Sequence, residues 1–167
     1  QNYEKQDHLI IIELKQWSTV KKTDKDAIVT VRFAEGEAEV SHPSYQAWSY
    51  ASLLENFNEA VYEGGIHLFP CAYLHNYVSD GVLTDDFYKY HIDRAPVFLK
   101  GDIEKKKLQD FIKKYVKHGD KDELIYRIDG SRIRPSKGLV DSLIGLLSGN
   151  DEFVLVPINV PRRYSDR

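Results

Sequence analysis

One cysteine and no methionine occur among the 167 residues of this chain. The single cysteine, Cys71, cannot form a disulfide within the chain, and this usage favours a reducing, cytoplasmic environment. Its place in the apolar string LFPCAYL predicts a core position rather than a reactive thiol. Because the chain lacks a starting methionine, we expect it to be a piece of a longer protein whose upstream residues matter.

Long apolar runs and a positive net charge are also missing. No run approaches the roughly 18 residues that a membrane span needs, so we expect no membrane partner. The net charge of −3 gives no overall attraction to nucleic acid, and any such surface must be a local patch. The chain contains no G-x-x-x-x-G-K-[ST] loop and therefore no ATPase of its own.

Hydrophobic residues make up 42% of the chain and aromatic residues 12%, which is enough for the core of one domain. Strand-like and helix-like segments alternate, so we predict an α/β or α+β fold with a central mixed sheet flanked by helices. Strands are expected at 8–17, 27–33, 66–77 and 152–158, the second antiparallel to the first. Pro70 indicates a bulge or an edge position for the third strand. Residues 21–26 and 34–42 are expected to form a turn and a loop.

Apolar residues at helical spacing and capping signals predict the helices. Pro43 opens the first, with Ser41 or His42 as its cap, and we expect it to run to Gly64–Gly65. A short helix capped by Thr84 is expected at 84–91. Further helices are expected at 103–120 and 135–150, and 123–128 fits either a strand or a helical turn.

The opening strand, LIIIELKQW (9–17), ends with two opposite charges. Because residues i and i+2 of a strand point the same way, we predict Glu13 and Lys15 on one face, with Ile12 and Leu14 filling the other. A carboxylate beside an ammonium there is costly unless the two are paired, solvated or bound to a metal. The pair suits metal-assisted phosphodiester cleavage, in which Glu13 holds Mg²⁺ and Lys15 positions water or neutralises phosphate. The alternative is a salt bridge at a sheet edge, since Glu-x-Lys is a common tripeptide.

The following helix carries Gln46 and Tyr50 four residues apart, and therefore on one helical face. Glu-x-Lys at the end of a hydrophobic strand, followed by a Gln-x-x-x-Tyr helix, resembles the PD-(D/E)XK nucleases and, within them, the RecB-like branch. Longer strings resemble an uncharacterised bacterial family that joins such a nuclease-like N-terminal segment to a P-loop helicase-type ATPase. These strings are IIELKQW, HPSYQAWSYASLL, PCAYLHNY, APVFLKGD and IRPSKGLVDSLIGLL.

The resemblance implies a restriction-endonuclease-like core in residues 1–156, truncated at its N-terminus, with 157–167 as a divergent tail or linker. It implies Glu13 as the ligand of Mg²⁺ or Mn²⁺ and Lys15 as the catalytic lysine, with Gln46 and Tyr50 orienting DNA or the active site. The family pattern places an aspartate on the preceding strand, and Asp7 cannot replace it. On one strand, six residues of about 3.3 Å each put Asp7 about 20 Å from Glu13. The metal site is therefore expected to be half built.

Basic and aromatic side chains supply candidates for nucleic-acid contact. Lys21 and Lys22 follow the first strand, where a solvated turn is the alternative. A second basic group precedes a helix N-terminus, where phosphate binding competes with a salt-bridge role; it comprises Arg132, Arg134 and Lys137. Trp17 and Trp48 could stack on bases, although core packing is the more common use of such tryptophans.

Two functions stay open on this sequence. The first is a metal-dependent nuclease domain that cuts DNA together with a downstream helicase/ATPase of the same full-length protein. The second is a catalytically inactive nuclease-fold module that binds nucleic acid or a partner.

Overall fold

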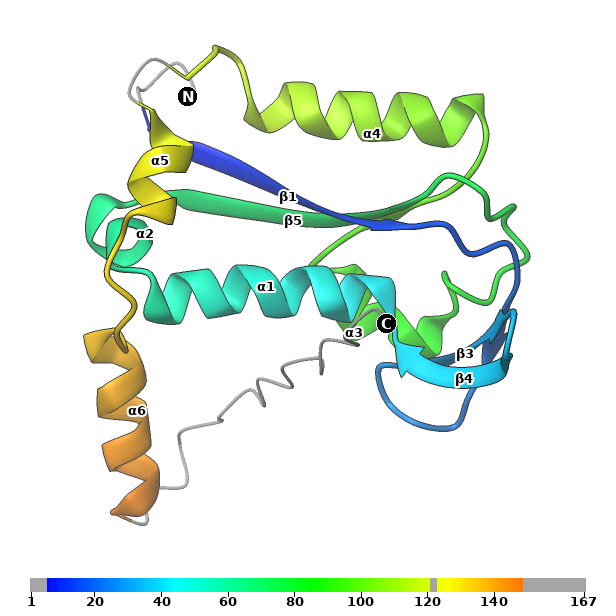
Figure 1. Ribbon diagram of the computed structural model, residues 1–167, viewed down its shortest axis with the longest axis horizontal. Coiled ribbons are helices and arrows are strands. Elements are labelled where there is room, and N and C mark those ends of the chain that lie inside the picture. The colour runs from blue at the N-terminus through cyan, green and yellow to red at the C-terminus, as the bar shows by residue number, and fades with distance from the viewer. Residues whose placement is uncertain (1–5, 121–122, 149–167) are drawn as a thin grey trace.

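Two three-stranded sheets organise the computed structural model, which describes residues 6–120 and 123–148 (Figure 1). The parallel sheet has the order β1–β5–β6, formed by His8–Lys15, His67–Leu74 and Val97–Phe98. The antiparallel sheet has the order β2–β3–β4, formed by Val20–Lys22, Ile28–Phe33 and Gly36–Ser41. The predicted α/β (α+β) class is confirmed, with the parallel and antiparallel strands in separate sheets.

The predicted pairing of segment 27–33 with the first strand is wrong. β3 pairs with β2 and β4, whereas β1 pairs in parallel with β5, with Ile12 opposite Cys71. The predicted turn at 21–26 contains the end of β2, and the predicted loop at 34–42 contains β4. Both strands are short or mostly exposed, so they lack the apolar alternation by which a strand is recognised in a sequence.

Pro70 lies in the middle strand of its sheet, and the predicted edge position is wrong. The amide of His67 donates to Asp7 on the β1 side, and that of Ala72 donates to Pro96 on the β6 side, both at 2.9 Å. Alternation along the strand turns the Pro70 nitrogen to the β6 side as well. Because β6 pairs only with Ala72 and Tyr73, the proline removes no hydrogen bond from that ladder.

Helices cover the two faces of the parallel sheet. α1 (Pro43–Phe57) and α4 (Asp102–Tyr115) lie on opposite faces, and α1 runs antiparallel to β1 (Figure 1). On the α1 side, Leu9 and Ile11 pack with the cluster that contains Ala51 and Leu54 of α1. The remaining helices are α2 (Glu59–Gly64), α3 (Lys89–Ile92), α5 (Leu124–Asp129), α6 (Lys137–Leu147) and the 3₁₀ helix η1 (Asp86–Tyr88).

Most predicted helices are confirmed, with different ends. His42 is the cap of α1, and its ring accepts a hydrogen bond from the Ser44 amide at 3.2 Å. The helix expected to continue to Gly64–Gly65 breaks at Asn58, and the helix at 84–91 is replaced by η1 and α3, with Asp85 rather than Thr84 as the cap of η1. Segment 123–128 is helical, and the strand expected at 152–158 lies outside the described residues.

Cys71 is a core residue, as its sequence context predicts. It is fully buried against Phe98 and Leu108, and burial raises the pKa of its thiol to about 12. Within residues 6–120 and 123–148, no helix is long and apolar enough to cross a membrane.

Candidate functional site

Glu13 and Lys15 lie near the carboxyl end of β1 and form an ion pair, with 2.7 Å between Lys15 Nζ and Glu13 Oε1. Alternation from Leu9 and Ile11 places both side chains on the α1 face, which confirms the predicted shared face. Their side chains are only 15% and 18% exposed. The pair is thus more sheltered from water than an ordinary surface salt bridge.

The opposite face of the same strand is unexpectedly open. Ile12 and Leu14 were predicted to fill it, yet they are 38% and 64% exposed. α4 packs mainly on Cys71 and Phe98 and reaches Ile10 in β1. The strand therefore turns two aliphatic side chains toward water and its charged pair toward a helix, the reverse of the usual hydrophobic pattern.

The backbone of β1 has a carbonyl between Glu13 and Lys15 in the chain, that of Leu14. The carbonyl of Asp7 accepts from His67 on the β5 side, so odd-numbered residues of β1 direct their backbone groups toward β5. The carbonyl of Leu14 consequently faces the other edge of β1. Among the described residues, no strand pairs with that edge.

Gln46 and Tyr50 form a second pair, on α1, with 2.9 Å between Gln46 Nε2 and Tyr50 Oη. On one flank of α1, Trp48 contacts Tyr90 of α3. Because α-helical residues advance by about 100° each, Gln46 and Tyr50 lie on the other flank of α1.

α1 packs on both β5 and β1. The N-terminal half of α1 also lies at the carboxyl end of β1 (Figure 1). Gln46 lies in this half of α1 and Tyr50 at its middle, and no hydrogen bond joins them to Glu13 or Lys15 among the described residues.

The predicted basic residues do not form one patch. Lys21 and Lys22 are neutralised by Glu37 at 2.5 Å and by Asp85 at 2.7 Å. Their strand, β2, belongs to the antiparallel sheet whose last strand, β4, leads into α1.

The other three predicted cations lie at the far end of α1. The amide of Arg134 donates to Phe57 at 2.8 Å, and its guanidinium pairs with Glu59. Arg132 and Lys137 are exposed nearby. α1 separates this group from Lys21 and Lys22 by about 20 Å, at about 1.5 Å per residue.

The oxygen atoms that could bind a metal ion near Glu13 are few. Within residues 6–120 and 123–148, no group of three His, Cys, Asp or Glu side chains could hold a metal ion. Asp7 pairs instead with Arg127, at 2.9 Å, near the far end of β1, which agrees with its predicted exclusion. Glu13 and the Leu14 carbonyl thus offer one carboxylate and one backbone oxygen. Mg²⁺ commonly keeps several waters and binds one or two carboxylates plus substrate phosphate, so these two oxygens do not make a protein-only cage.

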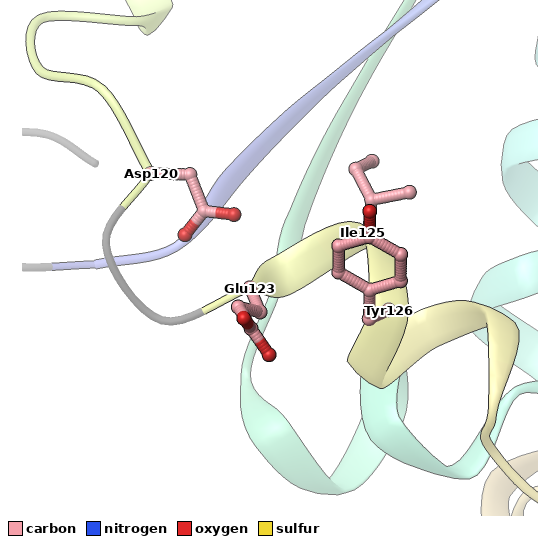
Figure 2. A pocket seen from close by; sticks show the side chains of 4 residues that line it. All are labelled: Asp120, Glu123, Ile125 and Tyr126. Atoms are coloured by element: carbon pink, nitrogen blue, oxygen red, sulfur yellow. The ribbon is translucent and has the colours of Figure 1, made fainter.

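An open pocket of about 500 Å³ lies elsewhere, at the start of α5. Figure 2 shows the four side chains that line it, which are Asp120, Glu123, Ile125 and Tyr126. The Asp7–Arg127 ion pair connects α5 to the amino end of β1. This pocket is therefore at the opposite end of the strand from Glu13, and none of the predicted site residues lines it.

Trp17 is the residue whose contribution sequence reasoning missed. Its predicted core packing is confirmed, since its side chain packs against the buried cluster of Val20 and Leu74, but the ring also lies 5.1 Å from Lys15 Nζ. The i+2 spacing from Lys15 was a signal for this contact, but Trp17 lies beyond the end of β1, where strand alternation no longer fixes direction.

Comparisons with known proteins identify no relative of this chain. Neither the protein-family models, nor the curated proteins, nor the solved structures contain a significant match to the chain.

Proposed function

We propose that this chain is a metal-dependent nuclease domain that acts on DNA. The observation that carries the proposal is the sheltered Glu13–Lys15 pair at the carboxyl end of β1, an edge strand among the described residues. Taking two charges out of water is unfavourable, and a pair that only stabilised the fold could be replaced by apolar residues. A site for a metal ion and a phosphate, in contrast, uses both charges.

The residues of the Glu13–Lys15 and Gln46–Tyr50 pairs each have a role in this proposal. Glu13 and the Leu14 carbonyl would hold Mg²⁺ or Mn²⁺, which when bound stabilises negative charge developing on the phosphoryl oxygens. Lys15 neutralises the scissile phosphate or orients the attacking water. Gln46 and Tyr50 orient the nucleic acid from α1.

The wider setting is also a proposal. We propose that the domain acts in the cytoplasm with a downstream helicase/ATPase of the same full-length protein. The family resemblance of the sequence supports this partner. The buried free thiol of Cys71 is compatible with a reducing compartment.

Plasmid nicking by the full-length protein tests the nuclease proposal. Cleavage should require Mg²⁺ or Mn²⁺ and stop with EDTA. Glu13→Gln and Lys15→Met should each lower the rate by about a hundredfold, the usual effect of removing one electrostatic contact to a transition state. Lys89→Met is the matched control, since it removes a lysine from an exposed ion pair outside the site, and should leave the rate unchanged. EDTA-resistant nicking, or a wild-type rate in Glu13→Gln, would refute the proposal.

A second candidate, nucleic-acid binding without cleavage, is favoured by the end of α4. Lys106 and Lys107 are neutralised by Asp110 and Glu104 of the same helix. Beyond Asp110, however, α4 and the next turn contain no acidic residue up to Gly119. The exposed lysines of this stretch, which make no ion pair among the described residues, are Lys113, Lys114 and Lys117. They form a local basic surface on a chain whose net charge is negative.

A further inference from the structure

The ammonium of Lys15 contacts two side chains. Glu13 Oε1 is 2.7 Å from Nζ, and the centroid of the Trp17 ring is 5.1 Å from the same atom. A cation within about 6 Å of an aromatic centroid is attracted to the ring face, and indole gives the strongest such attraction. With its side chain 18% exposed, Lys15 is partly desolvated, which strengthens both contacts.

Trp17 is itself held by the core. Its side chain packs against the buried cluster that includes Val20, Leu74 and Tyr77. The carbonyl of the preceding residue, Gln16, accepts a hydrogen bond from Asn76 at 3.4 Å, which ties this segment to the residues after β5. A packed ring is less mobile than a four-carbon lysine side chain, so the ring restricts the lysine more than the reverse.

We infer that Trp17 is a positioning residue for Lys15, holding its ammonium against Glu13 and shielding it from solvent. With only the carboxylate, the flexible stem could rotate away from Glu13; the indole supplies a second contact to the ammonium. The consequence for cleavage rests on the proposed function, whereas the contact itself does not.

Acylation of lysines tests the contact without any activity. The whole chain is treated with an N-hydroxysuccinimide acetate, and the labelling rate of each lysine is followed by peptide mass spectrometry. Trp17→Leu keeps apolar bulk but removes the ring, and should raise Lys15 labelling about tenfold, as expected from loss of a desolvated cation–π contact. Trp17→Phe keeps a weaker ring and should raise it about threefold.

Two controls separate loss of the Trp17 contact from a general loss of structure that would expose Lys15 to the reagent. Trp48→Phe alters the other tryptophan, which contacts Arg94, and should leave Lys15 labelling unchanged. Lys105, an exposed lysine of α4, is the internal reference for reagent and pH. An unchanged Lys15 rate in folded Trp17→Leu overturns the inference, as does an equal rise in Trp48→Phe. If Trp17→Leu loses the native circular dichroism spectrum, Trp17→Phe decides, and no rise there overturns the inference.

The nicking assay then separates failure of this inference from failure of the proposed function. Trp17→Leu should lower kcat about tenfold with KM unchanged, and Trp17→Phe about threefold. Labelling changes in a protein that never nicks would sink the nuclease proposal and leave the Trp17 contact standing. Wild-type kcat in Trp17→Leu, with the wild-type protein active, would overturn the positioning role.

Discussion

At the scale of single residues, the charges of Glu13 and Lys15 each depend on the other for stabilisation. Each side chain is mostly removed from water, so either charge left alone would be poorly solvated. The partner supplies the compensation at 2.7 Å. Removing one charge should therefore destabilise the fold more than removing both.

A double-mutant cycle measures this dependence. Lys15→Met should lower the free energy of unfolding by about 1–3 kcal/mol, because Glu13 is left uncompensated; its residual exposure keeps the loss below that of a fully buried pair. The double variant Glu13→Gln with Lys15→Met should recover at least half of that loss. Urea unfolding followed by circular dichroism gives all values. Strictly additive losses would mean that the two charges do not interact.

The sequence was enough to pair residues of this site but not to place them in the molecule. Strand and helix periodicity identified which partners share a face, and these are the pairs Glu13–Lys15 and Gln46–Tyr50. Which face of β1 is sheltered depends on where α1 and α4 pack, and no local pattern contains that information. Leu14 was consequently expected to be covered and is 64% exposed.

At the scale of elements, α1 begins with a histidine cap that works only when neutral. His42 Nδ1 accepts from the Ser44 amide, and Nε2 lies 3.2 Å from the Leu83 carbonyl, so the proton belongs on Nε2. Burial lowers the pKa of His42 to about 4. Protonation would replace the accepting lone pair with a donor that faces another donor.

This cap predicts a pH dependence of stability. The folded-state pKa of about 4 lies below the ordinary value of 6.5, so the unfolded chain binds more protons between these values. Stability from His42 is complete above about pH 6.5 and is lost as the pH falls toward 4, by up to about 3 kcal/mol.

Urea unfolding at pH 7.5 and pH 5 measures the change. His42→Asn keeps a good cap acceptor but does not titrate in this range, so its loss between the two pH values should be smaller than in the wild type. The difference between the two proteins removes contributions from the other five histidines. An identical pH dependence in both proteins would assign the effect elsewhere.

The break between α1 and α2 shows why some element ends could not be predicted. Asn58 accepts from the Val61 amide and so caps α2, but its Nδ2 also donates to the carbonyl of Ile128 at 2.9 Å. It further bridges to Ile133. These partners lie about 70 positions along the chain, so the helical periodicity continues through Asn58 while tertiary contacts end the helix.

At the scale of the whole molecule, charge position matters more than net charge. The triple variant Lys113→Glu, Lys114→Glu, Lys117→Glu should weaken duplex DNA binding at least about tenfold at low salt if this end of α4 contacts phosphates. The slope of log affinity against log salt should fall by about 2 to 3, one unit for each lost contact. Fluorescence anisotropy over a series of NaCl concentrations provides both values.

A control triple variant makes the same change in net charge elsewhere. Lys21→Glu, Lys25→Glu and Lys89→Glu replace exposed lysines that already have acidic partners. It should reduce affinity less and leave the salt slope close to the wild-type value. Equal effects of the two triples would attribute binding to overall charge and remove the support that α4 gives to a binding function.

The order of the strands in the parallel sheet has a consequence for how the chain folds. β1 and β5 are neighbours in the parallel sheet, yet β2 to β4, α1 and α2 all lie between them in the chain. Pairing across so long a loop is slow, whereas β2, β3 and β4 are joined by short connections and can form early. We expect β1 to dock on β5 late in folding, and Glu13 and Lys15 to meet α1 only then. An incomplete or nascent chain would thus lack the assembled Glu13–Lys15 site, and the proposed cleavage of DNA would wait until folding is finished.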